Sequence, residues 1–275
     1  MTIRLMNKVV RFFMEGQKLI HDWELSETNL QRLSQRKFEV AVLPVGAIEP
    51  HNRHLPEGQD WLHTTHVARE SCRRAWQQCQ SIICLPAIPY GVDCNLLDFP
   101  LTIHVSQATL DAMVRDIVAS LRHHQIQKIL LINGHGGNDF KPLVRQLQCE
   151  LDVHLFLCDW WRVAADHYSG IFEMPDDHAG EFETSIALAL FPQLVELANA
   201  GPGLTRPFRF EALNKGWVQA SRRFSRLNDH CAAGDPTKAS ADKGKKYLDL
   251  VIQRISDFLV EMATSPLDDF FPQQP

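Results

Sequence analysis

The sequence predicts a single α/β domain in which helices flank a mostly parallel central sheet. Short apolar runs, typical of buried strands, alternate with longer stretches in which apolar residues recur at helical spacing. Polar clusters rich in His, Asp and Glu follow several of these apolar runs. Parallel sheets covered on both faces have such apolar strands, and their functional sites form at the carboxyl ends of the strands. We therefore expect one domain over residues 1–275, with its functional site along one edge of the sheet.

Each expected element can be placed on the sequence. Apolar, β-rich runs predict strands over residues 38–44, 81–86, 128–132 and 153–158. Apolar positions at helical spacing predict helices over residues 63–78, 107–123, 140–151 and 239–262. Another helix is expected to include His178 and to continue to Phe191. Residues 201–234 are rich in Gly, Pro and Arg, which predicts an excursion or an interface segment.

Composition excludes several classes of protein. The 275 residues carry 28 Lys and Arg against 33 Asp and Glu, with no basic block that would hold a nucleic acid. The apolar runs fall far short of the roughly 20 residues that a membrane helix needs. Residues 1–16 lack the small-residue cleavage site of a signal peptide. The seven cysteines form no CxxC pair and indicate reduced thiols in a cytoplasmic protein.

The first polar cluster, residues 42–60, includes the end of the first expected strand. Glu49 and His51 share one face of an extended segment, and Asp60 follows after a proline-containing loop. Carboxylate oxygen and imidazole nitrogen are ligands that zinc and manganese accept. The pattern indicates a metal site, with an ordinary polar surface loop as the alternative.

The second cluster is NGHGGN, residues 133–138, at the end of the third expected strand. His135 stands between glycines, which allow backbone angles and close approaches that other residues forbid. A metal-binding or catalytic histidine is one reading, and an anion-binding loop or a structural turn are the others. The spacing matches neither of the common glycine-rich phosphate motifs.

The third cluster is DDHAGEFETS, residues 176–185. His178 and Glu181 are three residues apart and would share one face of a helical turn. A buried acidic helix start needs a positive partner, and a metal ion supplies one. The alternative is an exposed capping turn with Asp177 or Thr184 as the cap.

Together, the three clusters resemble the creatininase (creatinine amidohydrolase) family. The family's opening motif, approximately PvGsxEqHGxHLPxxtD, is matched over residues 44–60, and NGHGGN is its second motif. Its third, HAGExETS, is matched over residues 178–185, and a weaker Gly-Asp-Pro and Lys-Gly pair is matched at 234–236 and 243–244. The resemblance spans about residues 38–246 and implies a creatininase-like fold.

The resemblance also implies an amidohydrolase with two divalent metal ions. The implied ligands are Glu49 and His135 for one ion, His51 and Glu181 for the other, and Asp60 as a bridge. A water between the ions, which could be zinc, manganese or iron, would be acidified and attack a C–N bond. His178 matches the family histidine that carries protons to the leaving nitrogen, a role that a near-neutral pKa suits. His178 and Glu181 are therefore the expected catalytic residues.

One departure concerns the ligands themselves. In creatinine-cleaving members, the second ion takes a Glu two residues after the histidine of the second motif, where this chain has Gly137. In those members the position of Glu181 is apolar. The resemblance therefore indicates that the ligand has moved from position 137 to position 181.

Other departures concern the substrate. Met174 stands where creatinine-cleaving members place a flap Trp, so creatinine itself is not the expected substrate. Asn52 departs from the usual EQHG, and residues 90–102 depart from YGxSxEHxxFPGT, at Asn95 and Leu101 among other positions. The expected substrate-binding residues are Asp93, Asn95, Gly136, Gly137 and Met174.

The sequence thus predicts a metal-dependent amidohydrolase acting on a small cyclic amide, a formamide or a peptide-like substrate. Neither nucleic acid nor membrane is an expected partner. The resemblance implies a homohexamer, with residues 201–234 as a candidate contact segment. A catalytically silent small-molecule-binding protein that keeps the fold is the alternative, and a nucleotide-binding module based on NGHGGN is a further one. The filled ligand positions favour the enzyme.

Overall fold

The structure is a computed structural model, and it describes residues 20–274. The interpretation of the amino terminus as lacking a signal peptide concerns residues 1–16 and lies outside this range, so it stays a prediction. Among the described residues, none of the helices combines the length and the apolar character that a bilayer crossing demands.

A four-stranded parallel sheet forms the centre of the fold, which confirms the predicted fold class. In sheet order its strands are β2 (Ile82–Cys84), β1 (Val40–Val45), β3 (Lys128–Asn133) and β4 (His154–Asp159). Every residue of β1 and β3, the two central strands, is buried. This explains why these strands are apolar runs without alternation, as expected for a sheet covered on both faces.

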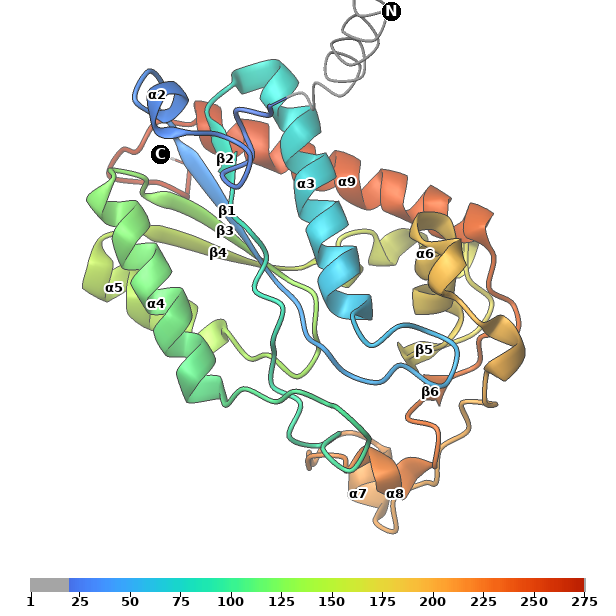
Figure 1. Ribbon diagram of the computed structural model, residues 1–275. Helices are drawn as coiled ribbons and strands as arrows, with labels where there is room; N and C mark the ends of the chain where they lie inside the picture. The colour runs from blue at the N-terminus through green and yellow to red at the C-terminus, as the bar shows by residue number, and fades with distance from the viewer. Residues whose placement is uncertain (1–19, 275) are drawn as a thin grey trace, which may run out of the picture.

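Two helices cover each face of the sheet (Figure 1). On one face lie α3 (Gln59–Cys79) and α9 (Ala241–Thr264), and on the other lie α4 (Gln107–His123) and α5 (Lys141–Leu151). Successive side chains of a strand point to opposite faces, so β1 and β3 contribute alternate residues to the two apolar cores. This is the three-layer arrangement that alternating strands and helices predict.

The third polar cluster folds differently from the helical turn that its spacing predicts. His178 ends a short strand, β5 (Asp176–His178), which pairs antiparallel with β6 (Ala233–Gly234). Ala179 follows with a φ of 56°, in the left-handed region, and α6 (Glu181–Leu190) begins only after Gly180. His178 and Glu181 therefore do not share a helical face.

The remaining elements are short. They are α2 (Leu30–Leu33), α7 (Glu211–Asn214), α8 (Phe224–Leu227) and the 3-10 helices at Trp160–Arg162, Ala165–Gly170, Pro192–Leu194 and Leu197–Asn199. The excursion expected over residues 201–234 contains α7, α8 and β6 joined by irregular chain. It lies beyond the carboxyl ends of the central strands, at the bottom of the view in Figure 1.

Candidate metal centre

Two loops and one helix end converge beyond the carboxyl ends of β1 and β3. The loop after β1 carries Glu49 and His51, the first turn of α3 carries Asp60, and the loop after β3 carries His135. All four side chains are buried. The sequence therefore brings together the residues of its first two clusters, as the position of functional sites in parallel sheets predicts.

Gly134 allows the loop after β3 to approach α3 this closely. A Cβ at this position would lie 1.5 Å from Thr64 Oγ1 and 3.2 Å from the Asp60 carbonyl oxygen. Any side chain here would push the loop away from α3 and separate His135 from Asp60. The close packing against α3 thus explains why a glycine precedes the histidine in NGHGGN.

Three histidines line the centre, and each donates its ring proton away from it. The bonds run from His51 Nδ1 to the Glu49 carbonyl (3.0 Å), from His135 Nε2 to the Val92 carbonyl (3.2 Å) and from His178 Nε2 to the Pro50 carbonyl (2.9 Å). A carbonyl oxygen can only accept, so it fixes the proton on the nitrogen that faces it. The other nitrogen of each ring faces the centre. Burial lowers the pKa of His51 and His135, but the neighbouring carboxylates outweigh it and raise the pKa of both rings well above the usual range, so without a metal this nitrogen keeps its proton. In His178 it presents a lone pair.

The inner nitrogens face carboxylate oxygens. Asp60 turns Oδ1 toward His51 Nε2 (3.1 Å) and Oδ2 toward His135 Nδ1 (3.0 Å), so its two oxygens serve two histidines. Glu49 Oε1 lies 3.3 Å from His135 Nδ1 and 3.8 Å from His178 Nδ1. Neighbouring ligands of an ion with bonds of about 2.0–2.2 Å are about 3–3.5 Å apart. A cluster of imidazole nitrogens and carboxylate oxygens at these separations fits divalent cations, which would replace the protons between them.

Three overlapping groups of potential ligands occur among residues 20–274. They are Glu49, His51 and His178; Glu49, Asp93 and His135; and His51, Asp60 and Glu183, each with ligand atoms within 4.8 Å of one another. The mixture of imidazole nitrogen and carboxylate oxygen suits zinc, manganese or iron. Because the groups share members, the cluster has enough ligand atoms for more than one ion.

Burial sets the protonation of the acidic side chains. It raises the pKa of Glu49 to about 7 and that of Glu183 to about 8, against the opposing influence of His135 and His51 respectively. Burial also acts on Asp60, but His51 and His135 outweigh it and hold the pKa of Asp60 well below its usual range. At neutral pH, bound protons therefore neutralise part of the negative charge of these side chains. Cations could replace these protons.

Glu181, the expected second ligand, points elsewhere. Its Oε2 accepts hydrogen bonds from the backbone N–H groups of Glu173 (2.8 Å) and Met174 (2.7 Å), and its Oε1 pairs with Lys243 Nζ (2.5 Å). The geometry therefore contradicts the expectation of Glu181 as a ligand or a catalytic residue. The reason is that α6 begins at Glu181, whereas the spacing argument placed His178 on the same helix.

Glu183 occupies the place that Glu181 was expected to fill. Two residues along an α-helix correspond to a rotation of about 200°, so the side chains of Glu181 and Glu183 leave α6 on nearly opposite sides. Glu183 Oε2 accepts a hydrogen bond from the Ala179 N–H (2.5 Å) and lies 3.8 Å from His51 Nε2. The carboxylate of the third motif that reaches the centre is therefore that of Glu183.

Gly137 is restricted by its neighbours. A Cβ at this position would lie 2.3 Å from His135 Nε2 and 2.4 Å from the Val92 carbonyl oxygen. A Glu here, which the resemblance associates with creatinine-cleaving members, would require the histidine ring or the carbonyl to move. The centre thus accommodates an acidic side chain from α6 and not one from position 137.

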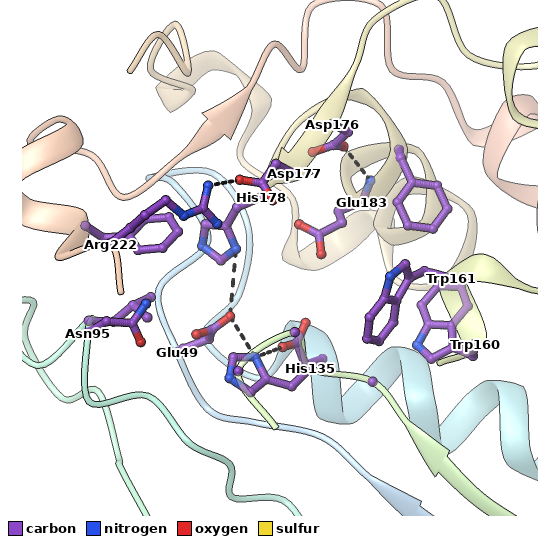
Figure 2. Close-up of a pocket in the computed structure, with 17 residues that line it drawn as sticks. Glu49, Asn95, His135, Trp160, Trp161, Asp176, Asp177, His178, Glu183 and Arg222 are labelled. Atoms are coloured by element: carbon purple, nitrogen blue, oxygen red, sulfur yellow. Dashed lines mark hydrogen bonds and ion pairs between the residues drawn. The ribbon is translucent and has the colours of Figure 1, made fainter. Parts of the chain in front are cut away.

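A cavity of about 390 Å³ opens onto the centre (Figure 2). Its walls include Asn95, Gly136, Gly137, Trp160, Trp161, Asp177, Arg222 and Phe224. In the view of Figure 2, Asn95 and Arg222 lie across the cavity from the two tryptophans, and Arg222 pairs with Asp177. The volume is in the range of small-molecule sites.

The expected substrate-binding residues divide into two sets. Asn95, Gly136 and Gly137 line the cavity. Asp93 is fully buried behind His135, and the backbone of Met174 is held by Glu181, so neither contributes to the cavity wall. For these two positions the expectation does not agree with the structure, because Asp93 turns inward from its loop and Met174 lies beyond the edge of the cavity.

Sequence reasoning missed Trp160, Trp161, Arg222 and Phe224. The two tryptophans follow β4 directly, so the rule that located the other clusters would have found them. Arg222 and Phe224 belong to the irregular segment 201–234, whose path no local pattern specifies. Only the folded chain shows that they reach the cavity.

The pKa of His178 differs from the expectation. Burial, reinforced by His51, lowers it to about 3, whereas a near-neutral value was expected.

Asn52 adopts a left-handed backbone conformation. It has a φ of 58°, and its side chain bonds the backbone of Gly201 at 2.9 and 3.0 Å. Asn tolerates the left-handed region better than most residues, which explains how it replaces the glycine of the family motif.

The comparison with known families agrees with the geometry of the centre. The model of the creatininase family, described as creatinine amidohydrolase, matches residues 23–259. This match covers most of the chain. The protein therefore belongs to the creatininase family, whose members include metal-dependent amidohydrolases.

Individual relatives show how diverse the family is. The chain is 27% identical to a creatinine amidohydrolase of Pseudomonas putida over 81% of its own length and 89% of the relative. It is 29% identical to a mycofactocin precursor peptide peptidase of Mycobacterium ulcerans, over 74% of its own length and 78% of the relative. The two relatives are named for different substrates, so family membership does not by itself define the substrate.

Solved structures give the same fold. A proposed creatinine amidohydrolase of Bacteroides fragilis superposes with a TM-score of 0.83 at 34% identity, covering 90% of this chain and 99% of that one. A structure titled as the manganese form of creatininase superposes with a TM-score of 0.67 at 25% identity, covering 88% and 99%. The four-stranded sheet and its helical layers are therefore a creatininase-like fold.

The two glutamates of α6 can be separated by matched substitutions. We expect Glu183→Gln to weaken metal binding, because the amide keeps the bond to Ala179 but replaces the carboxylate that faces His51. Glu181→Gln should bind metal normally and lower the melting temperature, because Lys243 loses its charged partner. Elemental analysis and thermal unfolding of both variants provide the measurement. Metal loss in Glu181→Gln alone would contradict the assignment.

Metal binding should release protons and strengthen with pH. The raised pKa values of Glu49 and Glu183 mean that the metal-free protein still holds protons near neutral pH, and a metal must displace them. Affinity for Zn²⁺ or Mn²⁺ should therefore rise between about pH 6 and pH 8. Calorimetry in two buffers of different ionisation enthalpy measures the released protons. Binding with no proton release and no pH dependence would refute this account of the cluster.

Proposed function

We propose that this protein is a metal-dependent amidohydrolase that cleaves a C–N bond of a small cyclic amide, a formamide or a peptide-like substrate. The observation that carries the proposal is the buried cluster of three histidines and the carboxylates around them. This cluster lies at the floor of a cavity of about 390 Å³ that can admit a small molecule. Membership in the creatininase family supports the reaction class.

Five side chains would hold two divalent ions. Glu49 and His135 would serve one ion, His51 and Glu183 the other, and Asp60 would face both. When bound, such ions lower the pKa of a water and offset the negative charge that develops on an amide oxygen. The contacts of Asp60 with two different histidines support its role as the shared ligand. Zinc, manganese and iron all accept this ligand set, and one relative is titled as a manganese form.

His178 would move the proton. Its Nε2–H is held by the Pro50 carbonyl, and its Nδ1 lone pair lies 3.8 Å from Glu49 Oε1, at the cavity. The low pKa keeps the imidazole neutral, so the ring can accept a proton at Nδ1. The resulting imidazolium is acidic and would pass this proton readily to the leaving nitrogen. The ring is also packed against Phe224, with centroids 5.0 Å apart, which fixes its orientation.

The cavity walls would determine which amide fits. Trp161 offers an aromatic surface, and Asn95 offers both a donor and an acceptor. The Arg222–Asp177 pair stands at the exposed side of the cavity, where a polar or charged substrate group could displace one partner. These features support a small polar amide, in line with the range of substrates for which the relatives are named.

The assembly and location follow as part of the proposal. Leu204, Phe210 and Trp217, in the segment 201–234, are large apolar side chains that are strongly exposed in the single chain. Such a group of residues supports a homo-oligomer, which the family resemblance makes a hexamer, and a monomer in sedimentation at micromolar concentration would contradict it. All seven cysteines are free, which is compatible with a cytoplasmic location.

The decisive experiment combines metal content with turnover. Purified protein should contain two divalent ions per chain and hydrolyse at least one member of a panel of cyclic amides, formamides and short peptides. Asp60→Ala should lose both ions and all activity, because it removes the carboxylate that faces both histidines. Two bound ions without turnover of any amide class would indicate a silent binding protein instead.

Removing His178 should separate metal binding from turnover. His178→Ala is expected to keep both ions and lose about 10²–10⁴-fold in kcat, the usual size of a general acid–base contribution. His167→Ala, which removes a largely exposed histidine outside the cavity, is the matched control and should be unaffected. Metal content, melting temperature and kcat are measured on each variant. Metal loss would make His178 a ligand, and unchanged kcat would remove it from catalysis.

A further inference from the structure

Asp93 is a buried carboxylate that has no role in the reaction proposed above. Its exposed fraction is 0%, and it lies outside the cavity wall. Its Oδ1 is 2.9 Å from His135 Nε2. Apart from this contact, neither carboxylate oxygen has a hydrogen-bond partner among residues 20–274. A carboxylate buried so completely is costly unless a positively polarised group faces it, and the ring of His135 is that group.

The backbone around Asp93 is held from several sides. The Asp93 N–H donates to His104 Nδ1 (3.1 Å), and its carbonyl accepts from the Leu96 N–H (3.0 Å). The preceding Val92 N–H donates to Asn138 Oδ1 (3.0 Å), which ties this loop to the loop that carries His135. The carboxylate is thus presented to His135 by a fixed backbone.

Two acceptors meet at the outer nitrogen of His135. The Nε2–H donates to the Val92 carbonyl at 3.2 Å, and Asp93 Oδ1 lies beside it at 2.9 Å. Both keep a proton on Nε2, so Nδ1, which faces Glu49 and Asp60, is the nitrogen that a metal ion would bind. A carboxylate behind a ligating imidazole also fixes the ring and makes the other nitrogen a stronger ligand.

This arrangement is a departure from the family pattern. The resemblance places Ser at the position of Asp93, in YGxSxEH, so the charge is a feature of this chain. The same region contains Gly137, whose missing side chain leaves room for the ring of His135 beside the Val92 carbonyl. Neighbouring groups therefore hold the ring of His135 in place both on the side that faces the metal centre and on the opposite side.

We propose that Asp93 is a positioning residue that orients and polarises His135 so that Nδ1 can bind a metal ion. The inference rests on the proposed function, because it takes Glu49, Asp60 and His135 as the ligands of one ion. Asp93 acts through the imidazole and does not itself contact the ion. Direct ligation by Asp93, which also lies within reach of Glu49 and His135, is the competing arrangement.

The contact itself can be tested in the metal-free protein. The proton on His135 Nε2 should give a downfield NMR resonance, because it donates to the Val92 carbonyl with the Asp93 carboxylate beside it, and His135→Gln identifies the signal. In Asp93→Asn this resonance should move upfield, since an amide replaces the neighbouring carboxylate. An unchanged resonance would refute the contact, and this readout does not depend on metal binding or on activity.

The consequence is tested by metal affinity. Chelator competition with Zn²⁺ and with Mn²⁺ should show binding at one ion weakened about 10–100-fold in Asp93→Ala, with a smaller loss in Asp93→Asn, which keeps an acceptor. Asp98→Asn, a surface carboxylate in the same loop that pairs with Arg223, is the matched control and should bind both ions normally. Thermal unfolding of each variant verifies that it folds.

Each result decides between the alternatives. Unchanged affinity in folded Asp93→Ala would overturn the positioning role, and complete loss of one ion in both Asp93 variants would make Asp93 a ligand and overturn it as well. If the wild-type protein bound no metal, the proposed function would fail, and this inference would fail with it. The two failures are distinguishable, because the wild-type affinity tests the first and the difference between variants tests the second.

Discussion

The structure depends on how the charge of a buried cluster of carboxylates and histidines is neutralised. Glu49 and Asp60 face the ring nitrogens of His51 and His135 at a buried centre. Each imidazole keeps one proton on the nitrogen that faces a backbone carbonyl outside the cluster, and the carboxylates keep a second proton on the inner nitrogen by raising the pKa of both rings. Cations can take the place of the inner protons, and a protein that gathers these groups without cations must retain those protons instead.

The parallel sheet makes this gathering possible. Its central strands end side by side, so the loops after β1 and β3 begin at neighbouring points although they are far apart in sequence. Gly134 then brings the second loop against α3, and β5 delivers His178 from the opposite side. The two loops are short extensions of buried central strands, and this limits the freedom that binding an ion would otherwise remove.

The distribution of charge between the two glutamates of α6 shows how the same motif can serve two purposes. Glu181 holds the chain before β5 through the backbone of Glu173 and Met174, with Lys243 balancing its charge. Glu183 faces the metal centre instead. One carboxyl group therefore fixes the position of the loop beside the cavity, and the other faces His51 within the centre.

The sequence by itself determined the fold class, the central strands and most of the residues of the centre, because apolar periodicity and residue chemistry are local properties. It did not determine which glutamate faces inward, since this depends on the residue at which α6 begins after the left-handed turn at Ala179. Nor did it place Asp93 behind His135. Which ring nitrogen faces the centre was decided only by tertiary structure, because the carbonyls of Val92 and Pro50 that accept the protons come from segments distant in the chain.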